Sequence, residues 1–196
     1  MAVQWNIKLI NMSIKHPAKL FFLLTASVFC LALVACSQDQ KNTNIQTNSG
    51  VQFEAISFTD WSDKLTQYSP KVVVVDLWAM WCLPCIERFP KMVDLNQKYA
   101  DKNVAFVSIN FDDPEDTEGL QKAENFLKEV GATFDNFYFN ENLIDSFEHM
   151  GVIALPTVLV YDSAGNEFRR LTNTNPNRQF SGKDIEDVIE KLLVAN

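Results

Sequence analysis

The stretch from Val72 to Trp78 is the part of the sequence that most constrains the fold. It is apolar at nearly every position and rich in β-branched residues, a pattern typical of a strand that helices cover on both faces. We therefore expect this strand at the centre of a sheet. A helical pattern follows from about Cys82 to Tyr99, and Pro90 inside it lacks a backbone donor and should kink the helix.

The chain beyond this point alternates between strand and helix patterns. Further strands are expected at Val51–Ile56, Val104–Asn110, Thr157–Tyr161 and Glu167–Leu171. Further helices are expected at Thr59–Tyr68 with Thr59 or Asp60 as N-cap, at Leu120–Val130 with Gly131 as C-cap, at Asn142–Met150, and around Ile185–Leu193. Turn residues from Asp162 to Asn166 indicate a hairpin. The alternation predicts an α/β fold in which helices cover both faces of a sheet.

Residues 1–35 are expected to be a targeting sequence. Leu20–Ala35 is almost wholly apolar and follows three lysines without any acid, as in a secretory signal. The run is shorter than the about 20 residues that a membrane-spanning helix needs. It ends in Leu33-Val34-Ala35-Cys36, which resembles the lipobox of bacterial lipoproteins, where the signal is cut before a cysteine that then carries lipid. The alternative is an uncleaved signal anchor, and both place the rest of the chain outside the cytoplasm.

The lipobox resemblance implies three segments: a signal peptide at 1–35, a lipid-anchored tether at 36–50 and one domain at 51–196. The tether is polar, is rich in Asn, Gln, Ser and Thr, and lacks an apolar period, which suits a flexible linker. Cys36 would carry the lipid. Ser37 follows it, and by the sorting rule of enteric-type lipoproteins this favours the outer membrane over the inner membrane, with the domain facing the periplasm.

The charge of the domain disfavours some partners. The whole chain has a formal net charge of −8, and removal of residues 1–35, with their three lysines and no acid, lowers it to −11. A domain this acidic is a poor candidate for binding nucleic acid or anionic lipid.

Cys82 and Cys85 are the only cysteines in the predicted domain, and they stand where the buried strand gives way to a helix. A helix N-terminus has unpaired N–H groups and a partial positive charge, so a thiol there ionises more easily and becomes a nucleophile. This placement favours a redox site. A zinc site normally takes four ligands, and His149 is the only histidine in the domain, so zinc is disfavoured. A purely structural bridge over so short a loop would add little stability.

Four segments resemble the thioredoxin superfamily. Val75–Cys85 is similar to its active-site segment, Pro90 stands where thioredoxins keep a helix-kinking proline, and Gly151–Thr157 resembles their cis-proline loop. Asn110–Asn140 resembles the insertion of the membrane-tethered TlpA/ResA group, an added helix and short strand. The resemblance implies a thioredoxin fold, with a central mixed β-sheet flanked by helices and a TlpA-type insertion.

The resemblance also implies a role for each residue of the site. Cys82 would attack a substrate disulfide, and the more deeply placed Cys85 would resolve the mixed disulfide. Asp76 lies on the apolar strand, where burial should raise its pKa, and would take the proton of Cys85. Pro156 would be cis, and the backbone at Leu155 would pair with an extended substrate.

Other residues near these motifs receive predictions as well. Trp78 is expected in the core, and Trp81 on the rim, where it would shape the surroundings of the sulfur atoms and contact substrate. TlpA/ResA-type sequences often have Glu three residues after the second cysteine, but here that residue is Arg88, which we expect on a solvated helix face. His149 is expected to be structural, and the acidic run Asp112–Glu118 to be solvated.

The family resemblance implies an extracytoplasmic thiol–disulfide oxidoreductase that reduces protein disulfides. Its redox group would be the Cys82–Cys85 pair itself, with no further cofactor and no metal. A membrane electron donor of the DsbD/CcdA type and oxidised client proteins, apocytochrome c among them, are the implied partners. Two alternatives stay open: a non-catalytic lipoprotein that binds peptides through a thioredoxin fold, and a disulfide-forming oxidant.

Overall fold

One mixed β-sheet organises the protein, which we describe from a computed structural model over residues 50–174 and 179–195. In sequence order its strands are β1 (Glu54–Ile56), β2 (Val72–Trp78), β3 (Val104–Asn110), β4 (Asp135–Phe139), β5 (Thr157–Tyr161) and β6 (Glu167–Thr172). They lie side by side in the order β1-β4-β3-β2-β5-β6. β2 runs parallel to β3 and antiparallel to β5, so the predicted central position of β2 and the mixed sheet are both confirmed.

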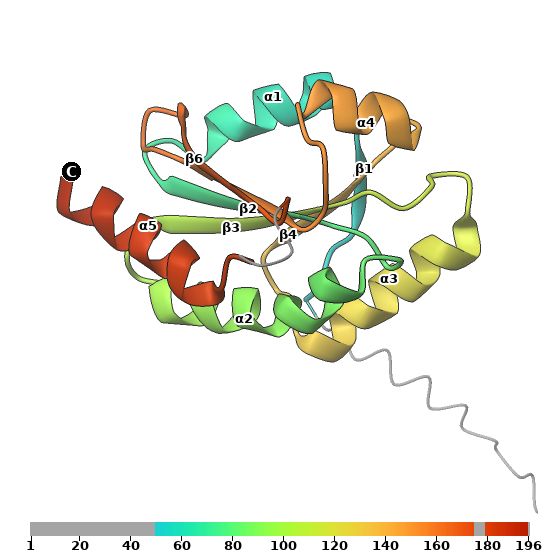
Figure 1. Ribbon diagram of the computed structural model, residues 1–196, viewed down its shortest axis with the longest axis horizontal. Coiled ribbons are helices and arrows are strands. Elements are labelled where there is room, and N and C mark those ends of the chain that lie inside the picture. Colours follow the sequence, from blue (N-terminus) through green and yellow to red (C-terminus); the bar gives the residue numbers. More distant parts are fainter. Residues whose placement is uncertain (1–49, 175–178, 196) are drawn as a thin grey trace, which may run out of the picture. The chain divides into compact units, whose positions relative to one another are not determined.

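Helices cover both faces of this sheet (Figure 1). They are α1 (Phe58–Gln67), α2 (Leu83–Tyr99), α3 (Thr117–Val130), α4 (Leu143–His149) and α5 (Gly182–Ala195). α1 and α4 lie on one face, and α2, α3 and α5 lie on the other. The predicted α/β architecture is therefore confirmed, including a helix (α3) and a strand (β4) within the segment that resembles the TlpA-type insertion.

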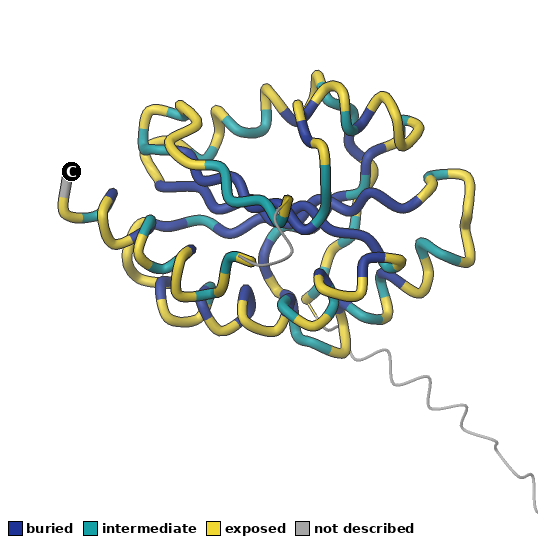
Figure 2. The backbone as a smooth tube through the Cα atoms, in the orientation of Figure 1, coloured by how far each residue is buried: buried dark blue, intermediate teal, exposed yellow. Residues whose placement is uncertain are grey.

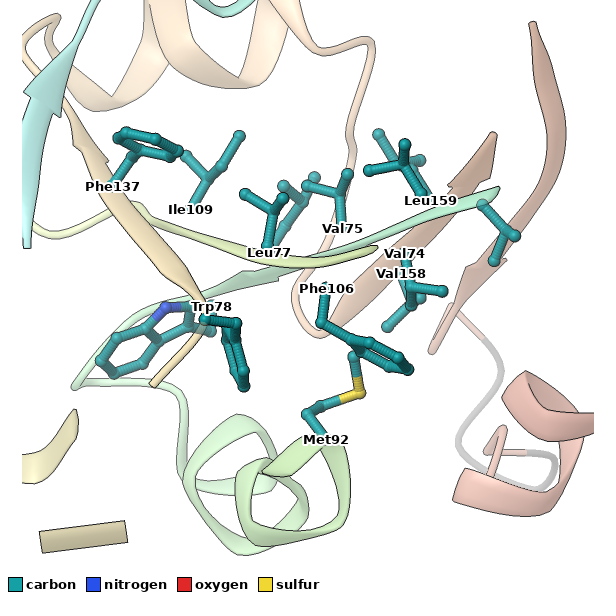
Figure 3. Packing of buried hydrophobic residues seen from close by; sticks show 14 of the residues in the cluster. Val74, Val75, Leu77, Trp78, Met92, Phe106, Ile109, Phe137, Val158 and Leu159 are labelled. Atoms are coloured by element: carbon teal, nitrogen blue, oxygen red, sulfur yellow. The ribbon is translucent and has the colours of Figure 1, made fainter. Parts of the chain in front are cut away.

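The strand β2 is buried along its whole length (Figure 2). Because side chains alternate along a strand, Val75 and Leu77 point to one face of the sheet, while Val74 and Trp78 point to the other (Figure 3). Phe106 of β3 and Met92 of α2 lie on the same side as Val74 and Trp78. Asp76 belongs to the same alternate set as Val74 and Trp78, so the strand directs its carboxylate toward α2.

The ends of the helices depend on local hydrogen bonds. The predicted N-cap of the first helix at Thr59 or Asp60 is wrong, because the Asp60 N–H donates to Ser57 Oγ over 3.0 Å and α1 begins at Phe58. The predicted C-cap of α3 is confirmed, since Gly131 adopts the left-handed conformation with φ of 71° that glycine accepts without strain.

Strand ends were predicted less well at the edges of the sheet. β1 begins at Glu54 and not at Val51, because it pairs only with β4, over three residues. The hairpin between β5 and β6 is confirmed, with Gly165 at a φ of 84°.

Predictions about the N-terminal 49 residues, which include the signal peptide, Cys36 and almost all of the tether, lie outside the described residues. Within residues 50–174 and 179–195, no helix is long and apolar enough to cross a membrane.

Candidate active site

The two cysteines lie at the N-terminus of α2 and are joined as a disulfide, with a Cα–Cα distance of 5.3 Å. Cys82 is the N-cap residue and Pro84 falls in the first turn, where a proline costs no helical hydrogen bond. Cys82 is 5 % exposed and Cys85 is fully buried, so the predicted order of exposure is confirmed. The positive end of the α2 dipole favours a thiolate here.

The cis-proline loop reaches the same edge of the sheet. The Leu155–Pro156 peptide bond is cis, as predicted. Leu77 of β2 pairs with Thr157 of β5 in an antiparallel register, so Pro156 lies level with the end of β2, from which the chain continues to Cys82. The Thr157 hydroxyl donates to the Ala154 carbonyl over 2.7 Å and thereby fixes the loop.

An apolar pocket of about 550 Å³ lies between α4 and this loop. Leu143, Ile144, Phe147, Val152 and Ile153 are among the residues that line it. Trp81 and Leu83, on either side of Cys82, are 58 % and 64 % exposed, and Trp78 is buried, so the predicted placements of the two tryptophans are confirmed. Large exposed apolar side chains thus flank both the cysteine pair and the proline loop.

A buried carboxylate holds the loop between β2 and the cysteines. The Met80 N–H donates to both oxygens of Asp112, over 2.9 and 3.1 Å, and the Asn110 amide donates to Asp112 Oδ2 over 2.7 Å. Burial raises the pKa of Asp112, although the Asn110 and Met80 hydrogen bonds lower it. The prediction that the acidic run is solvated is therefore wrong for Asp112. Its place just beyond β3, beside the end of β2, was the signal that it would meet the active-site loop.

Asp76 is fully buried beneath α2, and its partner is Arg88. Arg88 Nη2 donates to Asp76 Oδ1 over 2.5 Å. Burial raises the pKa of Asp76, as predicted, while the charge and hydrogen bond of Arg88 oppose the rise without cancelling it. The prediction that Arg88 is solvated is wrong: its side chain is 9 % exposed. A carboxylate on an apolar strand needs a partner, and that was the signal for Arg88.

His149 lies at the end of α4, where its Nδ1 is 2.7 Å from Glu141 Oε2 and its ring stacks on Phe58 with centroids 5.0 Å apart. These contacts join α4 to α1 and accord with a structural role. Among the described residues, no group of three or more His, Cys, Asp or Glu side chains is arranged to hold a metal ion.

The buried Asp76 should make the oxidised protein less stable as the pH rises. A carboxyl group whose pKa is higher in the folded than in the unfolded chain stabilises the fold fully below its unfolded pKa, about 4, and this contribution is lost as the pH rises through the folded pKa. We expect the free energy of unfolding to fall in that range by up to about 1.4 kcal/mol per pH unit, as measured by urea unfolding. The decline should be smaller in the Asp76→Asn variant, where Asp112 is left as a carboxyl group with a raised pKa; an equal decline in both proteins would contradict the assignment.

Comparison with known proteins agrees with this geometry. A family model described as thioredoxin-like matches residues 69–167. The thiol-disulfide oxidoreductase ResA of Geobacillus thermodenitrificans is 26 % identical over 129 residues, which cover 66 % of this chain and 67 % of that protein. The thioredoxin-like protein YneN of Bacillus subtilis is 32 % identical over 95 residues, or 48 % of this chain and 52 % of YneN.

A solved structure shows the same fold. The crystal structure of a putative thiol:disulfide interchange protein DsbE from Chlorobium tepidum superposes with a TM-score of 0.54 at 27 % identity, and covers 66 % of this chain and 84 % of that one. The family model includes β2, the cysteine pair and the cis-proline loop. The chain belongs to the thioredoxin-like family.

Proposed function

We propose that this protein is an extracytoplasmic thiol–disulfide oxidoreductase that reduces disulfide bonds in other proteins. The observation that carries the proposal is the Cys82–Cys85 pair at the N-terminus of α2, level with a cis-proline loop. The exposed apolar side chains of Trp81 and Leu83 and the pocket beside Ile153 support a protein substrate, because such surfaces mark sites of protein contact.

The reaction proceeds in two exchanges. In the first, the Cys82 thiolate attacks one sulfur of the substrate disulfide, forms a mixed disulfide and releases the other substrate sulfur as a thiolate. In the second, Asp76 takes the proton of Cys85, and the Cys85 thiolate attacks Cys82 Sγ. The Cys82–Cys85 disulfide forms and the second substrate sulfur leaves as a thiolate. The substrate gains two electrons and the cysteine pair loses two.

Substrate binding adds a strand to the site. The backbone at Leu155, just before the cis proline, pairs with an extended segment of the substrate by β-strand addition. Trp81 contacts the substrate on the other side of the binding site. Apocytochrome c is one oxidised client of suitable chemistry. The reduced pair is regenerated by a membrane donor of the DsbD/CcdA type. Lipidation at Cys36 holds the protein on a membrane, with Ser37 favouring the outer one.

The reduction potential of the cysteine pair tests the direction of the reaction. We expect the full chain in detergent, equilibrated against dithiothreitol or glutathione buffers, to have a potential close to the about −270 mV of thioredoxin. Alkylation followed by mass spectrometry reports the oxidised fraction of the Cys82/Cys85 peptide and ignores the other two cysteines. A potential near about −120 mV would instead identify a disulfide-forming oxidant.

A further inference from the structure

The ion pair between Arg88 and Asp76 lies in the interior. The Asp76 side chain is fully buried and that of Arg88 is 9 % exposed. In a typical surface pair of this protein, Lys122 and Glu118 are 63 % and 81 % exposed. An interior pair acts strongly on the charge state of its members because little water screens it.

Arg88 binds only one of the two carboxylate oxygens of Asp76. Its Nη2 binds Asp76 Oδ1, while Asp76 Oδ2 has no hydrogen-bond partner among the described residues. The ring of Phe180, in the segment before α5, lies 5.2 Å from the guanidinium carbon. The guanidinium thus contacts both a ring and a carboxylate, and the second carboxylate oxygen is buried without a hydrogen-bond partner among the described residues.

The helix that carries Arg88 also carries the resolving cysteine. Cys85 and Arg88 are three residues apart on α2, a spacing that places two side chains on the same helix face. Arg88 therefore fixes the carboxylate of β2 relative to the helix face that bears Cys85.

Other elements packed around Asp76 bring little charge to it. Its paired neighbours are Ser108 on β3 and Val158 on β5. At the start of α5, Asp184 accepts hydrogen bonds from the Ser181 backbone and hydroxyl. Arg88 is the charged group that acts on Asp76, by both its charge and its hydrogen bond.

We infer that Arg88 is a positioning residue for the resolving step: it holds Asp76 as a carboxylate with Oδ2 free to accept the proton of Cys85, and so extends resolution to lower pH. The inference rests on the proposed function. Without Arg88, burial acts on Asp76 unopposed and keeps the carboxyl protonated over more of the pH range. A protonated Asp76 accepts no proton from Cys85.

Single-turnover reaction with oxidised glutathione separates the two exchanges. Release of the first glutathione reports attack by Cys82, and release of the second reports resolution by Cys85. In Arg88→Met, we expect the pH at which the resolution rate rises to increase by about one pH unit or more. The rate of attack by Cys82, measured at saturating pH, should not change. Arg88→Lys should restore most of the wild-type profile. Lys91→Met, which removes an exposed cation from the same helix, is the matched control and should leave the profile in place.

A second comparison distinguishes positioning from a merely structural role. In an Asp76→Asn background, the additional Arg88→Met change should not move the pH profile further, because the group on which Arg88 acts is gone. An unshifted profile in Arg88→Met, or an equal shift in the Asp76→Asn background, would overturn the inference. If Arg88→Met does not fold, Arg88→Gln replaces it, and identical profiles for Arg88→Gln and Arg88→Lys would overturn the inference too. Wild-type protein that releases no glutathione at all would overturn the proposed function as well.

Discussion

Replacement of Cys85 by serine is expected to stop turnover and to leave the substrate bound to Cys82 as a mixed disulfide. Cys82 is the more exposed of the two cysteines at the helix N-terminus, so it still attacks, but serine offers no thiolate to release the substrate. Cys82→Ser should abolish both turnover and adduct formation. Mass spectrometry of the protein after reaction with a disulfide-bonded substrate, before and after dithiothreitol, measures the adduct.

The location of the adduct is the control in this experiment, because the full chain has four cysteines. The substrate mass should appear on the peptide that contains Cys82, and the double variant with serine at 82 and 85 should form none there. Full turnover by Cys85→Ser would contradict a dithiol mechanism and would favour the alternative of a peptide-binding module whose cysteine pair does no chemistry.

Removal of Arg88 alone should strongly destabilise the fold near neutral pH. Arg88→Met leaves the Asp76 carboxylate buried without its partner, and breaking a buried ion pair in this way typically costs about 3–5 kcal/mol. The cost should shrink toward about pH 4, since protonation of Asp76 removes the uncompensated charge. Urea unfolding of the oxidised protein at several pH values measures the difference from wild type.

The double variant Asp76→Asn/Arg88→Met is the matched control for this loss. It removes both charges and replaces them with an amide and an apolar side chain of similar size, so most of the lost stability should return. A double variant as unstable as Arg88→Met would show that Arg88 stabilises the fold through its packing against Phe180, and not through Asp76.

The sequence predicted correctly those elements whose pattern depends only on their own residues. β2, β3 and β5 begin and end at the predicted residues, because each is a continuous apolar run that buries both faces. Gly131 was predicted correctly because glycine accepts the left-handed conformation without strain, and the cis bond at Pro156 was predicted correctly because of the resemblance to the thioredoxin cis-proline loop. The change from a strand pattern to a helix pattern predicted correctly that the two cysteines lie at the N-terminus of a helix.

The wrong predictions concern residues whose surroundings come from elsewhere in the chain. Arg88 has the charge and spacing of a surface residue, and only the position of β2 beneath α2 supplies the carboxylate that draws it inward. Asp112 belongs to an acidic run, but the parallel register of β2 and β3 brings the Met80 N–H to it. Ser57, Thr59 and Asp60 are all good N-caps, so the sequence did not distinguish among them.

The antiparallel pairing of β2 with β5 has a consequence for how such a protein diversifies. The sulfur atoms follow β2, whereas the loop from Gly151 to Pro156 precedes β5, about 70 residues further along the chain. Under the proposed function, the reacting residues and part of the client-binding surface are therefore encoded in separate stretches of sequence that meet at one edge, while Trp81 and Leu83 add to that surface from the cysteine stretch. Under that proposal, we expect substitutions at exposed positions such as Ile153 to change which protein docks and to leave the N-terminus of α2, where the cysteine pair lies, unchanged.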